Sequence, residues 1–107
     1  MTDAAVVLIV DDEERNRRLL QMMLQAEGYV TLLAGDGREA LDSVALHDVD
    51  LILLDVAMPG MNGYEVLQLI RADSRWDAMP VLMISGLDEI SHTVRCIEAG
   101  AEDFLPK

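Results

Sequence analysis

Apolar and polar residues alternate in blocks along the chain, and the blocks are of two kinds. Short runs of consecutive apolar residues are typical of strands that are covered on both faces of a sheet. Longer segments between them carry apolar residues three and four positions apart, as amphipathic helices do. The pattern predicts strands at Ala5–Val10, Val30–Ala34, Asp50–Leu54, Pro80–Ile84 and Asp103–Leu105. It predicts helices at Glu14–Glu27, Asp36–His47, Asn62–Arg71 and Asp88–Ala99.

Local signals mark the ends of the first three predicted helices. Gly28 stands just after the first one, at the position where a glycine commonly ends a helix. Asp36 with Glu39, and Asn62 with Glu65, have the spacing of capping boxes at the start of the next two. The predicted boundaries therefore rest on capping chemistry as well as on periodicity.

The alternation of strand and helix predicts an α/β fold. Consecutive strands joined by right-handed helical crossovers form a parallel sheet with helices on both faces, so we expect a doubly wound five-stranded sheet. Residues 1–107 are expected to form one domain. No helical pattern follows the last predicted strand, and we expect the domain to be truncated before a closing helix.

Composition narrows the classes of partner. The chain has 8 basic and 20 acidic residues, which gives a formal net charge of −12. That balance argues against direct binding to nucleic acid and to anionic membranes, because no basic stripe is present to neutralise phosphates. A basic partner or a bound cation is favoured instead. The single cysteine and the short apolar runs, without a signal peptide or membrane span, suggest a cytoplasmic protein.

Polar side chains follow the predicted strands at the same edge of the sheet. Asp11 and Asp12 follow the first strand, Asp55 the third, Ser85 the fourth and Lys107 the fifth. Ligands of open parallel sheets bind outside the carboxyl ends of the strands, at the point where strand order reverses. We therefore expect these side chains to share one site.

Such a site has a definite chemistry. Two carboxylates about 4 Å apart repel by roughly 4 kcal/mol at an effective dielectric constant near 20, and a hard divalent cation such as Mg²⁺ relieves this. A carboxylate surrounded by a metal, a lysine and a hydroxyl is equipped to accept a phosphoryl group. Simpler interpretations stay open, because Asp12 or Glu13 could cap the following helix and Asp55 could be a solvated strand-end acid.

Four motifs together resemble one family. The segments VLIVDDEERNR, LILLDVAMPGMNGYEVL, PVLMISG and AGAEDFLPK resemble, in order and spacing, the receiver domain of bacterial response regulators in two-component signalling. The resemblance covers essentially the whole chain and lacks only the family's last helix. It implies a flavodoxin-like strand order 2-1-3-4-5. It also implies a phosphorylation-dependent switch, and not an enzyme acting on other molecules.

The resemblance assigns roles to the acids. Asp55 corresponds to the phosphoacceptor, which takes a phosphoryl group from a phosphohistidine. Asp12 corresponds to the main ligand of Mg²⁺ or Mn²⁺, with Asp11 beside it through water, and the backbone carbonyl of Ala57 would supply a further ligand.

Further positions correspond to the family's switch and hydrolysis positions. Ser85 and Lys107 would bind the phosphoryl group, and Phe104 would turn inward once Ser85 moves. Ala57 and Leu87 lie at positions that tune hydrolysis of the acyl phosphate in the family. Both are apolar and cannot orient a water, so we predict slow self-dephosphorylation.

Partners also follow from the resemblance. They are a sensor histidine kinase or phosphotransfer protein, and an output domain or downstream protein that the sequence does not identify. Arg15, Asn16 and Arg18 open the helix that commonly meets the kinase in this family. Dimerisation through the fourth helix and fifth strand is also suggested.

Two other classes of protein are weighed against this interpretation. Phosphatases of the haloacid dehalogenase type also use an aspartate nucleophile with Mg²⁺, but normally carry a second aspartate where this chain has Ala57. A dinucleotide-binding module would need a glycine-rich turn after the first strand, where this chain has acids instead.

Overall fold

The computed structural model describes residues 4–56, 58, 60, 62–76 and 78–84. Within them, four parallel strands form one sheet in the order β2-β1-β3-β4. The strands are β1 (Val6–Val10), β2 (Val30–Ala34), β3 (Leu51–Asp55) and β4 (Val81–Ile84). The predicted parallel α/β sheet is therefore present, with the first four strands in the expected order.

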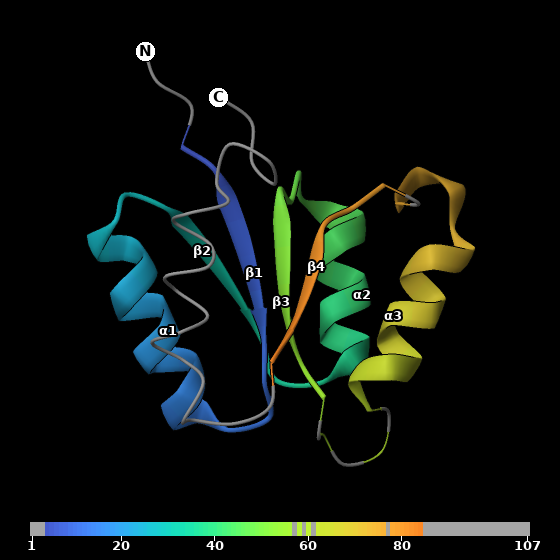
Figure 1. Ribbon diagram of the computed structural model, residues 1–107, viewed down its shortest axis with the longest axis horizontal. Coiled ribbons are helices and arrows are strands. Elements are labelled where there is room, and N and C mark those ends of the chain that lie inside the picture. The colour runs from blue at the N-terminus through green and yellow to red at the C-terminus, as the bar shows by residue number, and fades with distance from the viewer. Residues whose placement is uncertain (1–3, 57, 59, 61, 77, 85–107) are drawn as a thin grey trace.

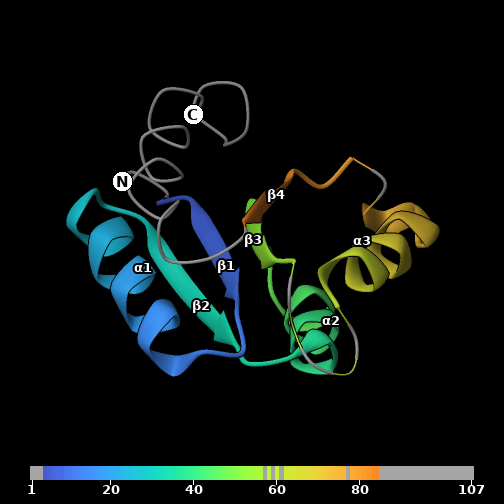
Figure 2. The same ribbon diagram turned by 60° about the horizontal axis from the view of Figure 1, so that its bottom comes forward.

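Helices cover both faces of this sheet. Helix α1 (Glu14–Ala26) lies on one face, and α2 (Gly37–Leu46) with α3 (Gly63–Ala72) lies on the other (Figures 1 and 2). A short 3-10 turn, η1 (Ser74–Trp76), follows α3. Every strand-to-strand connection among these elements passes through a helix, as parallel pairing requires.

Alternation along the strands divides the core into two layers. Successive side chains of a strand point to opposite faces, so odd and even positions of β1 enter different clusters. Val7 and Ile9 pack with Leu20 and Leu24 of α1. The other layer lies against α2 and α3, and its fully or almost fully buried members include Leu8, Val10, Ile52, Leu54, Val66 and Ile70.

The predicted helix ends are largely confirmed. Gly28 follows the end of α1 with φ +92°, a left-handed conformation that glycine adopts without strain. Asn62 and Glu65 form a complete capping box at α3. At α2, the Asp36 side chain accepts from the Glu39 N–H at 2.8 Å, but the Glu39 carboxylate accepts from the Gly35 N–H instead, so the second half of that box is displaced by one residue.

One prediction about burial was wrong. Strand β2 was expected to be covered on both faces, but Val30 is 47% exposed and Leu33 is 37% exposed. β2 is hydrogen-bonded to β1 alone among the described strands, and an edge strand is shielded less than a central one. In contrast, every residue of β3 is buried between β1 and β4.

The boundaries of the described elements differ from the predictions by at most one residue. Asp50 precedes β3 and Asp55 is its last residue, so the strand is shifted by one toward the candidate site. The predicted fifth strand, the fourth helix and the expected end of the domain lie outside the described residues.

Candidate metal centre

Strand register brings the first and third strands' acids to neighbouring positions. Val10, the last residue of β1, is paired with Leu54 of β3. The residues that follow this pair, Asp11 and Asp55, are therefore neighbours. Ile9 and Leu53 are paired across the two strands and lie on the same face of the sheet. Asp11 and Asp55 each lie two residues further along, so their side chains point to that same face. The same hydrophobic alternation that builds the core therefore directs both carboxylates to the same side.

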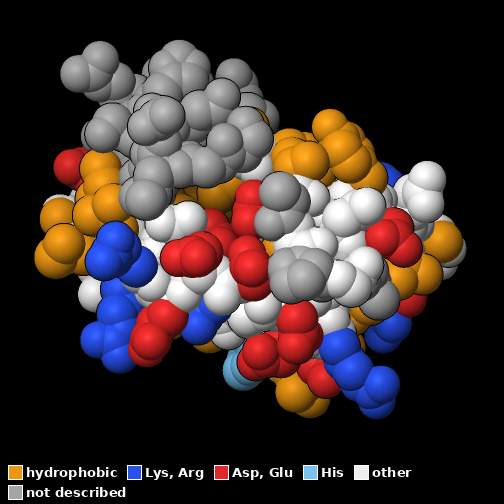
Figure 3. All heavy atoms as spheres, turned by 90° about the horizontal axis from the view of Figure 1, so that it is seen from below, with side chains coloured by type: hydrophobic (Ala, Val, Ile, Leu, Met, Phe, Trp, Pro, Cys, Tyr) orange, Lys and Arg blue, Asp and Glu red, His pale blue; other side chains and the backbone are white. Residues whose placement is uncertain are grey.

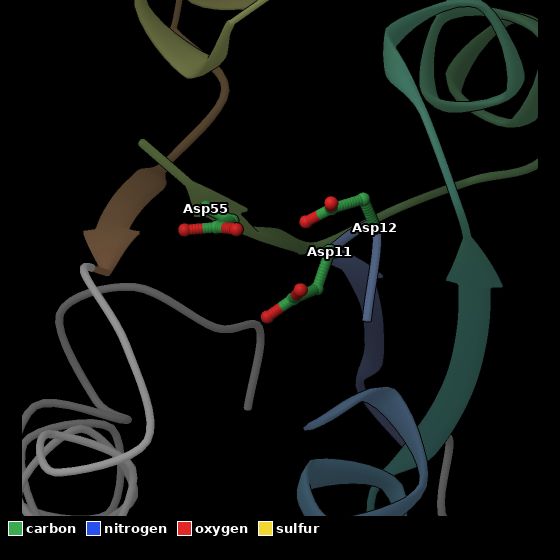
Figure 4. Close-up of side chains that lie close together, drawn as sticks. All are labelled: Asp11, Asp12 and Asp55. Carbon is green, nitrogen blue, oxygen red and sulfur yellow. The ribbon is translucent and has the colours of Figure 1, made fainter. Parts of the chain in front are cut away.

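Three carboxylates converge at this edge. One carboxylate oxygen each from Asp11, Asp12 and Asp55 lies within 4.8 Å of the others (Figure 4). Asp11 is 2% exposed and Asp55 is 7% exposed, whereas Asp12 is exposed. Acidic side chains gather around the centre of this face of the molecule (Figure 3). The convergence predicted from the sequence is present for these three acids.

Asp11 is held in place by hydrogen bonds from the loop and helix that follow it. Its Oδ1 accepts from the Glu13 N–H at 2.9 Å, and its Oδ2 accepts from Asn16 Nδ2 at 3.3 Å. Its backbone carbonyl accepts from Arg17 Nη1 at 2.6 Å, and its own N–H donates to the Ala34 carbonyl. The buried carboxylate is thus fixed before any ligand arrives.

The start of α1 tests the alternative that Asp12 or Glu13 caps this helix. Glu13 is the N-cap of α1, and its side chain makes no capping hydrogen bond. Asp12 is not the capping residue. The capping prediction is therefore confirmed only for the position of Glu13, without a side-chain bond, and the exposed Asp12 carboxylate faces the cluster instead of the helix (Figure 4).

Sequence reasoning misplaced Asn16. It was grouped with Arg15 and Arg18 as a surface for the kinase, but it is 7% exposed and lies against Asp11. The signal was its spacing: Asn16, Leu20 and Leu24 are four residues apart and form the buried stripe of α1. A polar residue on that stripe must find a partner inside the protein.

Sequence reasoning also missed Gly63, the first residue of α3. A Cβ atom at this position would collide with the Asp55 carbonyl oxygen and lie 3.0 Å from both the Asp55 carbonyl carbon and Val56 Cα. The Gly63 N–H donates to the Val56 carbonyl at 3.1 Å. Helix α3 can pack this closely on the end of β3 only because residue 63 has no side chain.

The donor set suits a magnesium ion. Mg²⁺ prefers oxygen ligands at 2.0–2.1 Å in an octahedron, which places opposite ligands about 4.2 Å apart, and it keeps several waters. Three carboxylate oxygens within 4.8 Å of one another match this span when one of them binds through water. The separation is also small enough for mutual repulsion, which a divalent cation would remove.

Five other predicted site positions lie outside the described residues. They are Ala57, Ser85, Leu87, Phe104 and Lys107. Their assignments stay predictions.

Comparison with known proteins identifies the family. Residues 7–107 match the model of the response regulator receiver domain, and the chain belongs to that family. Receiver domains are parts of two-component systems, in which response regulators interact with sensor histidine kinases and serve signalling rather than classical enzyme turnover.

Curated proteins with similar sequences are also response regulators. The chain is 43% identical over 88 residues to Response regulator MprA of Mycolicibacterium vanbaalenii, covering 82% of this chain and 37% of that protein. It is 38% identical over 89 residues to DNA-binding response regulator MtrA of Mycobacterium tuberculosis, covering 83% and 38%. The chain thus spans less than two fifths of the length of these curated relatives.

Solved structures share the fold. Chemotaxis protein CheY4 of Vibrio cholerae superimposes with a TM-score of 0.74 at 34% identity, covering 86% of this chain and 81% of that one. A response regulator receiver protein from Pseudomonas putida superimposes with a TM-score of 0.75 at 26% identity, covering 94% of this chain and 83% of that one.

Among the helices of the described residues, none has the length and apolar composition of a membrane span.

Proposed function

We propose that this domain is a phosphorylation-dependent switch that accepts a phosphoryl group on Asp55 from the phosphohistidine of a sensor kinase or phosphotransfer protein. Mg²⁺ or Mn²⁺ would be held by Asp12 and Asp55, by Asp11 through water, and by the backbone carbonyl of Ala57. The convergence of three carboxylates within 4.8 Å at the end of β3 carries the proposal. Membership of the receiver family supports it.

The bound cation would supply charge neutralisation, both for the acids and for the phosphoryl oxygens. A carboxylate oxygen of Asp55 attacks phosphorus in line with the leaving group. The O–P bond forms as the P–N bond to the histidine breaks, and that electron pair returns to the imidazole nitrogen. Because β3 is buried and paired on both sides, Asp55 is presented at a fixed position for this attack.

The product carries extra negative charge at Asp55, which Ser85 and Lys107 would bind. Phe104 would then turn inward as the segment around it shifts, so that a local electrostatic change biases a two-state element. Moving the active state from 1% to 99% needs a preference of roughly 5.5 kcal/mol, which a few charge-assisted hydrogen bonds can supply. With apolar Ala57 and Leu87, we expect the acyl phosphate to hydrolyse slowly.

Partners outside this chain complete the function. MtrA is described as DNA-binding, and the present chain matches only part of it. A net charge of −12 opposes phosphate contacts by these 107 residues themselves, so any DNA contact would belong to a different segment. An output domain or downstream protein that reads the switch, and a homodimer of receivers, are both compatible with the family. We further propose a cytoplasmic location for the domain.

Phosphoryl acceptance can be tested by mass measurement. The protein is incubated with acetyl phosphate and Mg²⁺, and the wild type is compared with Asp55→Asn and with Asp48→Asn. Asp48 is exposed and lies before β3, away from the cluster, so its variant is a matched control for loss of one carboxylate. We expect a stoichiometric phosphoryl adduct on the wild type and on Asp48→Asn, none on Asp55→Asn, and none when EDTA removes the metal.

Other outcomes would point elsewhere. Many turnovers of free phosphate without a stable adduct would favour a phosphatase of the haloacid dehalogenase type. An adduct that persists in Asp55→Asn would show that another residue accepts the phosphoryl group.

A further inference from the structure

The amide of Asn16 touches the acid cluster from the side of α1. Asn16 Nδ2 donates to Asp11 Oδ2 at 3.3 Å, and the residue is 7% exposed. Its other polar atom, Oδ1, is buried and has no hydrogen-bond partner among the described residues. A buried amide oxygen without a partner is uncommon in a native protein, since its desolvation is not compensated.

The chemistry of Oδ1 limits what can satisfy it. An amide oxygen only accepts hydrogen bonds, so its missing partner must be a donor. Reversing the amide would bring Oδ1 against the Asp11 carboxylate, two acceptors facing each other, so the observed orientation is the favourable one. The two amide atoms share one carbon, which puts Oδ1 within the span of a single bridging water from Asp11 Oδ2.

Water bound to a metal ion is such a donor. Its lone pairs face the cation, so both of its hydrogens point outward and need acceptors. The cluster of Asp11, Asp12 and Asp55 suits an ion that keeps several waters. Residues that hydrogen-bond to a metal's ligands, without touching the metal, orient those ligands and change the affinity of the site for the metal.

We propose that Asn16 is a positioning residue for the metal centre: its amide nitrogen fixes Asp11, and its amide oxygen accepts a hydrogen bond from a water of the bound cation. The proposal rests on the proposed metal site and adds a second contact with the hydration shell, from α1, beside the water-mediated contact proposed for Asp11. It separates Asn16 from the exposed residues of α1, such as Arg18, which pairs with Glu14 on the surface.

Mg²⁺ titration of the purified protein tests this contact. Binding is measured by calorimetry, and the metal-free unfolding temperature is measured beside it, for the wild type, Asn16→Leu and Gln25→Leu. Leucine approximates the shape of asparagine without its polar atoms. Gln25 is an exposed amide on the same helix, bonded to Thr31 away from the cluster, and serves as the control.

We expect Asn16→Leu to bind Mg²⁺ about tenfold more weakly, within the 10- to 100-fold range typical of lost outer contacts. Its metal-free unfolding temperature should change little, because removal of the unpartnered oxygen offsets the loss of the hydrogen bond to Asp11. Gln25→Leu should bind Mg²⁺ like the wild type. If Asn16→Leu does not fold, Asn16→Ala removes the same amide without adding apolar bulk and should show the same weakening.

Two results would overturn the proposal. Unchanged Mg²⁺ affinity in a folded Asn16 variant would mean that the amide does not contact the hydrated ion. A lower metal-free unfolding temperature with unchanged affinity would assign Asn16 a purely structural role. Failure of the metal site itself gives a different result, because the wild type would then bind no Mg²⁺ and Asp12→Asn would change nothing.

Discussion

Replacing Gly63 by alanine sets two effects against each other at the end of β3. Alanine favours helix formation over glycine, and Gly63 begins α3 with no positive φ that would penalise a side chain. From propensity alone, the substitution would stabilise the protein by about 0.4–1 kcal/mol. The new methyl group, however, would overlap the Asp55 carbonyl oxygen, and a backbone atom of a central strand cannot rotate away as a side chain can.

The steric effect should dominate. Forcing an extra methyl group into a well-packed region typically costs about 1–3 kcal/mol, which exceeds the gain from propensity. We expect Gly63→Ala to lower the free energy of unfolding, measured by urea denaturation followed by circular dichroism. The displacement falls on the backbone of Asp55, so phosphoryl acceptance should slow as well, by up to roughly 100-fold for a shift near 1 Å. Mass measurement of adduct formation with acetyl phosphate gives this rate.

Gly35→Ala is the matched control. A Cβ at Gly35 would lie 3.1 Å from Glu39 Oε1 and 3.3 Å from Arg17 Nη1, which are ends of flexible side chains. We expect a smaller change in stability and a nearly normal phosphorylation rate. A Gly63→Ala protein that is more stable than the wild type and phosphorylated at the same rate would refute the packing argument.

Three further predictions concern capping, the core and pH. Asn62→Ala removes the cap of α3 and should lower the free energy of unfolding in urea by about 1 kcal/mol, whereas a change under 0.3 kcal/mol would contradict its capping role. Leu54→Ala should lower it by about 2–5 kcal/mol, because Leu54 is fully buried, and Leu46→Ala at a side chain that is 77% exposed should change it little. Hydrogen bonds from the side chain and backbone N–H of Arg75 lower the pKa of Asp73 from 3.8 to about 2, so the stability this pair contributes is present above pH 3.8 and is lost as the pH falls through about 2. An NMR titration of the Asp73 carboxyl should show this low midpoint, and Arg75→Gln should return it toward 3.8.

The sequence could predict the elements of the sheet because burial and periodicity are properties of the chain itself. Apolar runs marked β1 and β3, and strand-end acids marked the candidate site, since parallel strands carry their carboxyl ends to one edge. The exposure of β2 could not be read the same way, because an apolar run does not say whether a neighbouring strand will cover it.

Asn16 and Gly63 escaped prediction for a related reason. Each is defined by what packs against it from a distant part of the chain: the Asp11 carboxylate in one case and the backbone of Asp55 in the other. A polar residue in a helix usually faces solvent, and a glycine at a helix start usually reflects backbone geometry. Ser85, Lys107 and Phe104 stay predictions from the family resemblance.

The burial of β3 has a consequence for how a signal could leave this domain. All five residues of the strand are buried, and β3 is hydrogen-bonded to β1 on one side and β4 on the other. Its amide protons should therefore be among the slowest to exchange with solvent. A group attached to Asp55 is therefore held by a rigid strand. Any rearrangement after modification has to occur in the softer segments around it, and the strand serves as the fixed reference against which they move.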